Sequence, residues 1–313
     1  MTPVARLTGL DAARERFGDK ADRFAAFFMQ SDLLADQAVA ALESLPKPAA
    51  RTMLDAATHN GIASTPDAPP AMVALFRQLE HVPLWVDRER CSRGGAVVSR
   101  AGVFGGLALF GALARSYCSA GGNKPLVFTG ALVERTAERL TQTADFVRAI
   151  SEPHALDAGG AGYRAIVRVR FAHTHVRRAC VGSPKWRSED WGIPINQADM
   201  AGTVLLFSYA LIKLVRQLGG TISDDEASDL LHLWRYAGYL LGVDDELFAG
   251  LERRIGARRI HAEAGRRLGD EEGLAVAQRR LHPYRVDRLF RLDDIVKALG
   301  EDRRRLQEAK HGK

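Results

Sequence analysis

Apolar residues recur at helical spacing along almost the whole of this 313-residue chain, and strand-like alternation is nearly absent. The segments between breaks are also rich in good helix formers. The pattern predicts helices near residues 9–17, 20–31, 33–45, 48–59, 70–80, 86–117, 132–150, 160–181, 197–218, 223–241, 245–265, 270–281 and 292–309. Glycine and proline mark the breaks, as in Lys47-Pro48 and Gly121-Gly122-Asn123. We therefore predict an all-α fold.

The chain shows no internal repeat, no low-complexity segment and no linker. We predict one helical domain over residues 1–313, in which residues 1–80 form a helical cap on the rest. A chain of this size can enclose a cofactor as well as a core.

The formal net charge is +6, from 44 basic and 38 acidic residues. The basic residues are spread along many helices and interleaved with acids, which is typical of a solvated surface. Nucleic-acid binding is therefore not expected and stays a weak alternative.

Cysteine usage and apolar runs indicate the compartment. Cys91, Cys118 and Cys180 lie far apart in the sequence and form no CxxC motif, so we expect reduced thiols. Met1–Gly18 is charged and amphipathic, unlike a signal peptide. The most apolar run, Ala101–Ala114, is too short to span a bilayer. We expect a cytoplasmic protein without an integral membrane segment.

A histidine stands alone in an apolar helical stripe within Tyr163–Cys180. His173 is the one strongly polar residue of that stripe, whose other members are Ile166, Val169, Val176 and Cys180. His175 lies ~200° further around the helix, so the two imidazoles cannot converge on one metal ion. Two interpretations remain open for His173: a core histidine, or an axial ligand of a haem iron.

An arginine lies in the apolar stripe of Leu132–Ile150. Arg139 and Thr143, one turn apart, share that stripe, whereas Gln142 lies ~100° away from it. A buried guanidinium needs an anionic or dipolar partner. That partner is either a structural carboxylate or a group such as a cofactor propionate or an oxygen-derived ligand.

A third segment runs from Trp191 to Met200 and begins a helix. Asn196 and Asp199 form an expected N-cap pair. The helix then carries Thr203, whose hydroxyl can bond back to its own helix and so indicates little alone.

These segments resemble a known family in order and spacing. His173-Thr174-His175-Val176-Arg177 resembles the "HAxVR" segment of rubber (latex-clearing) oxygenases and MpaB-type oxygenases. The run from Pro194 to Thr203 resembles their "PIxQxDxxxT", and Arg139–Thr143 resembles "RxxKT". The segment from Gly122–Leu126 through Thr129-Gly130 matches one that many bacterial members carry before the arginine motif. The resemblance covers roughly residues 90–245, which would be a haem-binding, oxygenase-like core.

The resemblance implies a globin-like helical core with additional helices, haem b as cofactor and His173 as the iron ligand. It places Arg139, Gln142 and Thr143 at the catalytic side of the haem and Thr203 beside the cofactor. We further expect Arg177 to contact a propionate. The implied function is a haem-dependent oxygenase that acts with O2 on an apolar, isoprenoid-like or lipid-like alkene.

The chain departs from the family in two places. Gln142 stands where rubber oxygenases have a lysine over the iron, and Gly121–Lys124 lacks the acid that serves as their base. Without an export signal, polyisoprene itself is not the expected substrate. One alternative is a haem or apolar-ligand binding protein without turnover, a sensor or carrier. Another is a cofactor-free helical scaffold. The sequence indicates no oligomeric state.

Overall fold

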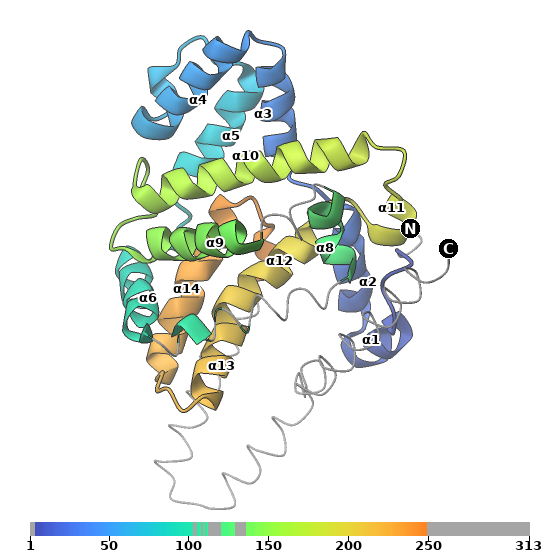
Figure 1. The fold of residues 1–313 in the computed structure, drawn as a ribbon, viewed down its shortest axis with the longest axis vertical. Helices are drawn as coiled ribbons and strands as arrows, with labels where there is room; N and C mark the ends of the chain where they lie inside the picture. Colours follow the sequence, from blue (N-terminus) through green and yellow to red (C-terminus); the bar gives the residue numbers. More distant parts are fainter. Residues whose placement is uncertain are drawn as a thin grey trace, which may run out of the picture.

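The computed structural model describes residues 4–248 apart from 103–104, 108, 110, 112–119 and 129–135. Every regular element among these residues is helical, which confirms the predicted all-α class (Figure 1). The α-helices are α1 Leu10–Phe17, α2 Asp19–Ala26, α3 Leu33–Glu43, α4 Lys47–Asn60, α5 Pro70–Glu80, α6 Arg88–Arg100, α8 Ala120–Phe128, α9 Thr136–Ser151, α10 Ala161–Val181, α11 Ser188–Trp191, α12 Gln197–Leu205, α13 Leu211–Gln217 and α14 Asp224–Leu240. Single 3-10 turns occupy Phe27–Met29, Ile62–Ser64 and Asp245–Leu247.

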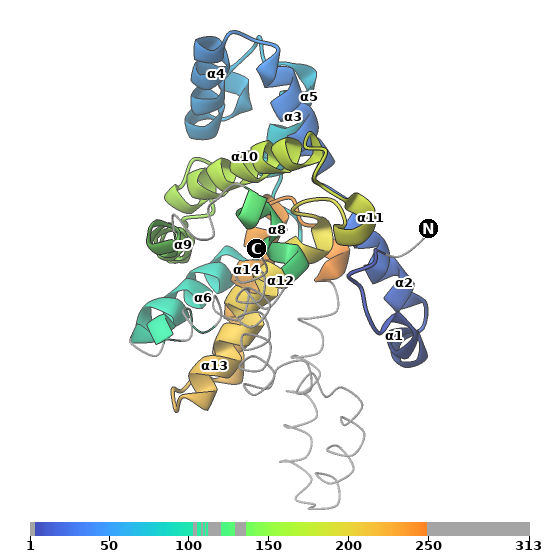
Figure 2. The ribbon, with the colours of Figure 1, turned by 45° about the vertical axis from the view of Figure 1, so that its right-hand side comes forward.

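The long helix α10 divides the molecule. Helices α3, α4 and α5 lie on one side of it, and α6, α9, α12, α13 and α14 lie on the other (Figures 1 and 2). The core centres on α14, whose fully or almost fully buried apolar side chains are Leu230, Leu231, Leu233, Trp234 and Leu240. Ser223 and Glu226 start this helix with a reciprocal capping box. The cap helices contact α10, and α5 also bonds directly to α14 through Gln78 and Tyr239.

Two glycines allow α6 to pack closely on its neighbours. A Cβ added to Gly94 would collide with the carbonyl oxygen of Asp229 on α14, and one on Gly95 would collide with that of Ser151 on α9. No larger residue fits there without movement of a backbone, so these positions fix how near the helices approach.

The predicted helix over 86–117 is not continuous. Helix α6 ends at Arg100, and Gly102 follows with a φ of 50°, which favours glycine. Most of the remainder of that range lies outside the described residues. The predicted helices over 270–281 and 292–309 also lie outside them, as does 249–265 of the helix predicted from residue 245.

The break predicted at Gly121–Asn123 is wrong, because these residues form the start of α8. Pro125 lies inside that helix, where it lacks the N–H of an ordinary residue. Gly and Pro signals can mark a break, but here packing on α10 overrides them.

The helix predicted over 197–218 contains a π-helical turn, Leu206–Ala210, between α12 and α13. Phe207 in this turn stacks on Trp234 of α14, with ring centroids 5.2 Å apart. By length and composition Gln197–Gln217 is apolar enough to cross a membrane, yet half of its most apolar window is buried. Core helices of water-soluble proteins have the same composition.

Candidate functional site

His173 lies half-buried on α10 without a hydrogen bond or ion pair among the described residues. Burial lowers the pKa of its imidazole to about 4, and the positive charge of Arg177 contributes to the shift. The negative charge of Asp32 acts in the opposite direction. The imidazole is therefore neutral at pH 7, the form in which a ring nitrogen can bind a metal ion.

The most buried face of α10 is rotated slightly from the predicted stripe. Ile166 and Cys180 are buried as expected, but Arg170, Thr174 and Arg177 are buried as well. Arg170, which is only 2% exposed, is a buried residue that the sequence pattern did not predict. Its partners lie far away in the sequence, and long-range pairing of this kind leaves no local signal.

Arg170 forms a buried ion pair with the cap. Its Nε and Nη2 donate to the two carboxylate oxygens of Asp32 at 2.6 and 2.9 Å. Its Nη1 donates to Gln78 Oε1 at 2.6 Å and to the Leu240 carbonyl at 3.0 Å. The bidentate geometry and the added acceptors offset the cost of burying this charge.

Arg177 is also paired inside the protein. Its Nε donates to Asp36 Oδ1 at 2.8 Å, Nη1 to the Ile195 carbonyl at 3.0 Å and Nη2 to Thr174 Oγ1 at 3.2 Å. All three nitrogens are thus engaged by protein oxygens. We therefore reassign Arg177 from the expected propionate contact to a buried ion pair.

Arg139, unlike Arg170 and Arg177, has a guanidinium nitrogen that no described residue pairs with. Its Nη1 is shielded from solvent and has no hydrogen-bond partner among the residues that the structure describes. The anionic or dipolar partner expected from the sequence is therefore not supplied by the described protein. An unpaired buried donor costs about 1–3 kcal/mol, so the group is poised to accept an anionic partner.

The two polar neighbours of Arg139 have local partners. Thr143 Oγ1 donates to the Arg139 carbonyl of its own helix at 2.8 Å. Gln142 is exposed, and its Nε2 donates to Glu138 Oε1 at 2.9 Å. The predicted separation of Gln142 from the stripe of Arg139 is confirmed, and its amide does not face the protein interior.

Helices α9 and α10 follow one another along the chain and contact each other, and they cross at an angle (Figures 1 and 2). The helices touch near their connection, where a Cβ on Gly162 would lie 2.9 Å from Ile150 Cα. Arg139 and His173 each lie about three helical turns from that contact.

The third motif is chiefly structural. Asn196 is the N-cap of α12, and its Oδ1 accepts from the Asp199 N–H at 2.9 Å, as predicted. Gln197 donates to the Ser31 and Gly242 carbonyls and accepts from the Asp244 N–H. Thr203 is exposed and donates to the Asp199 carbonyl at 2.9 Å. The segment thus joins α12 to the cap and to the chain after α14.

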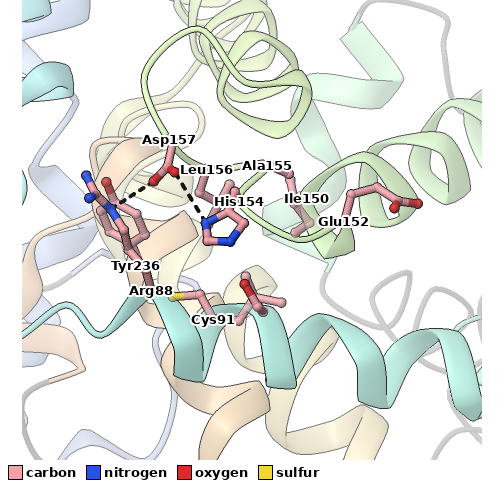
Figure 3. Close-up of a pocket in the computed structure, with 11 residues that line it drawn as sticks. Arg88, Cys91, Ile150, Glu152, His154, Ala155, Leu156, Asp157 and Tyr236 are labelled. Carbon is pink, nitrogen blue, oxygen red and sulfur yellow. Dashed lines mark ion pairs between the residues drawn. The ribbon is translucent and has the colours of Figure 1, made fainter.

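A small cavity lies at the connection between α9 and α10 (Figure 3). Asp157 accepts from Arg88 Nε at 2.9 Å and lies 3.5 Å from Nδ1 of His154, which has a positive φ of 57°. Cys91 and Tyr236 also line it. Its volume of about 10 Å³ admits one water molecule, so it cannot hold haem or an organic substrate.

No group of three or more His, Cys, Asp or Glu side chains is placed to hold a metal ion within the described ranges. A haem iron needs only one protein ligand, because the porphyrin supplies four nitrogens. His173 is therefore sufficient for this one kind of metal centre.

A sequence model of the family described as "ER-bound oxygenase mpaB/B'/Rubber oxygenase, catalytic domain" matches residues 99–299, and the chain belongs to this family. The match includes Arg139, His173 and Thr203, and it leaves the cap helices α1–α5 outside.

The chain is similar to a curated protein and to a solved structure. The rubber oxygenase of Streptomyces sp. (strain K30) is 26% identical over 213 residues, which are 64% of this chain and 49% of that protein. The chain thus spans about half the length of this relative. The structure of latex clearing protein LCP in the closed state matches with a TM-score of 0.60 and 24% identity. That match covers 74% of this chain and 63% of the other, and it shows a shared helical fold.

Proposed function

We propose that this protein is a haem-b-dependent oxygenase that acts with O2 on an apolar, isoprenoid-like or lipid-like alkene. The observation that carries the proposal is the neutral, unpartnered imidazole of His173 on the helix that packs against the helix of Arg139. Membership of the oxygenase family supports the reaction class.

The residues present fit a haem. His173 would bind the iron through a neutral ring nitrogen, and the unpaired Nη1 of Arg139 would meet a negative group of the cofactor or of its bound ligand. A haem iron binds and activates O2 when it is present. Val169 and Val176, half-buried near His173 on α10, would help to exclude water.

A haemin titration followed by absorption spectroscopy tests this proposal. We expect the wild type to bind one haemin per chain with a Soret band, and His173→Ala to lose it. His175→Ala is the matched control, because His175 is exposed and lies near Glu43 on the outer face of the same helix. A wild type without haem uptake, or equal uptake by His173→Ala, would refute the assignment.

Binding without turnover is a second candidate, and the position of Gln142 favours it. The amide is exposed, hydrogen-bonded to Glu138 and unable to act as a general base. Oxygen consumption by the reduced, haem-loaded protein with squalene as substrate separates the two functions. Consumption that depends on squalene supports the oxygenase, and its absence supports a sensor or carrier.

A further inference from the structure

Two buried ion pairs join α10 to the N-terminal cap. Arg170 pairs with Asp32, the N-cap residue of α3, and Arg177 pairs with Asp36, one turn further along α3. The side chains of Arg170 and Arg177 are 2% and 5% exposed, and those of Asp32 and Asp36 are 11% and 23% exposed, so the arginine end of each pair is removed from water and the carboxylate end is partly so. Buried charged pairs are sensitive to geometry, because loss of one partner leaves the other charge unbalanced.

The two arginines flank His173 on the helix surface. Arg170 precedes it by three residues and Arg177 follows it by four, and residues at these spacings are neighbours on a helix. A rotation or slide of α10 against α3 would separate both pairs at once. The pairs therefore fix the direction in which the imidazole projects.

We propose that Asp32 and Asp36 of the cap are positioning residues for His173, acting through Arg170 and Arg177 to orient the iron ligand and to balance the charge beside it. This inference rests on the haem site proposed above. Both carboxylates lie outside residues 99–299, so the cap would be part of the cofactor site and not only an attachment.

The expected effects follow from the charges. Removal of a residue that orients a metal ligand commonly lowers the affinity for the metal 10- to 100-fold. Asp36→Asn keeps the side-chain shape but leaves the positive charge of Arg177 unbalanced next to the ligand. An added positive charge disfavours ferric relative to ferrous iron, so the reduction potential of the bound haem should rise.

The experiment uses the full chain loaded with haemin. The rate of haem loss is measured as the transfer of haem to apomyoglobin, and the reduction potential is measured by spectroelectrochemistry. We expect Asp36→Asn to lose haem about 10-fold faster or more. We also expect a potential higher by about 59 mV, which corresponds to a tenfold change in the ferric-to-ferrous ratio. Asp36→Glu, which keeps the charge, should restore much of both properties.

Glu43→Gln is the matched control. Glu43 pairs with Arg178 at 2.7 Å and joins the same two helices, but both side chains are more than 40% exposed. This variant should keep wild-type haem loss and potential. If Asp36→Asn behaves like Glu43→Gln, the inference is overturned while the haem site stands.

A second variant distinguishes loss of the positioning contact from a general folding defect. Asp36→Leu combined with Arg177→Met removes both charges together, and such replacements commonly preserve stability. The inference predicts faster haem loss in this variant too, and wild-type loss would overturn it. If the wild type itself binds no haem, the proposed function and this inference fail together, an outcome distinct from the others.

Discussion

Gly242 lies where the chain passes the buried ion pair between Asp32 and Arg170. It has a φ of 79°, and an added Cβ would collide with Asp32 Oδ2 and lie 2.7 Å from Arg170 Nη2. The substitution Gly242→Ala should therefore strain the backbone and separate the two charged groups.

The two costs can be separated with a second glycine. Gly219 has a φ of 89°, and no atom lies within 4 Å of an added Cβ. Gly219→Ala thus carries only the backbone cost, about 1–2 kcal/mol. Gly242→Ala keeps both charged groups but pushes their ends apart, which adds at most the roughly 3–5 kcal/mol of a fully broken buried pair. The added cost is a large part of the roughly 5–15 kcal/mol that stabilises a typical protein.

Thermal unfolding followed by circular dichroism measures the difference. At roughly 2–4 °C per kcal/mol, Gly242→Ala should unfold below Gly219→Ala, by up to roughly 20 °C if the pair is fully broken. Equal losses in the two variants would refute the reasoning, because the Cβ at residue 242 would then not disturb the Asp32–Arg170 pair. A wild-type melting temperature for both would refute the backbone argument as well.

Three further predictions concern the haem-free chain. His173 has a pKa of about 4 in the folded chain against an ordinary value of 6.5. Between these two pH values the unfolded chain binds the proton and the folded chain does not. The free energy of unfolding should therefore be highest above pH 6.5 and fall by about 3 kcal/mol as the pH is lowered to 4. Urea unfolding at both pH values should show this loss in the wild type, and a loss of equal size in His173→Gln would contradict it. Gln197→Leu should lower the melting temperature clearly because three hydrogen bonds to backbone groups disappear, whereas Gln142→Leu, on the surface, should change stability by less than about 0.5 kcal/mol. Arg139→Met should raise the stability of the haem-free chain by about 1 kcal/mol and weaken haemin binding, because it removes a buried donor without a partner among the described residues. Arg148→Met, at an exposed position of the same helix, should do neither. Unchanged stability and binding in Arg139→Met would contradict this interpretation of the Arg139 Nη1.

Local pattern predicted the helices and part of the site. Helical periodicity separated His173 from His175 and set Gln142 apart from Arg139, and these relations depend only on helix geometry. The Asn196 cap was also predictable, because a cap and its partner lie three residues apart.

The buried partners could not be predicted in this way. Asp32 and Arg170 are 138 residues apart in the sequence, and their pairing depends on how α3 and α10 pack. The partner of Arg177 could not be predicted for the same reason. Its expected contact with a propionate did not take account of the carboxylate of Asp36 in the cap. Helix α8 was missed because Gly121, Gly122 and Pro125 are signals of a break in most contexts.

The π-helical turn Leu206–Ala210 has a consequence for how sequences of this family are compared. A π-turn holds one residue more than the α-helical turn it replaces, and each residue rotates an α-helix by ~100°. A π-turn and the α-turn it replaces each cover about one full rotation, so deleting one residue here would restore a regular helix and leave the faces of α12 and α13 nearly unchanged relative to each other. A single-residue gap at this point in an alignment would therefore keep α12 and α13 in register, and the change in the core would be confined to the turn, where Phe207 stacks on Trp234.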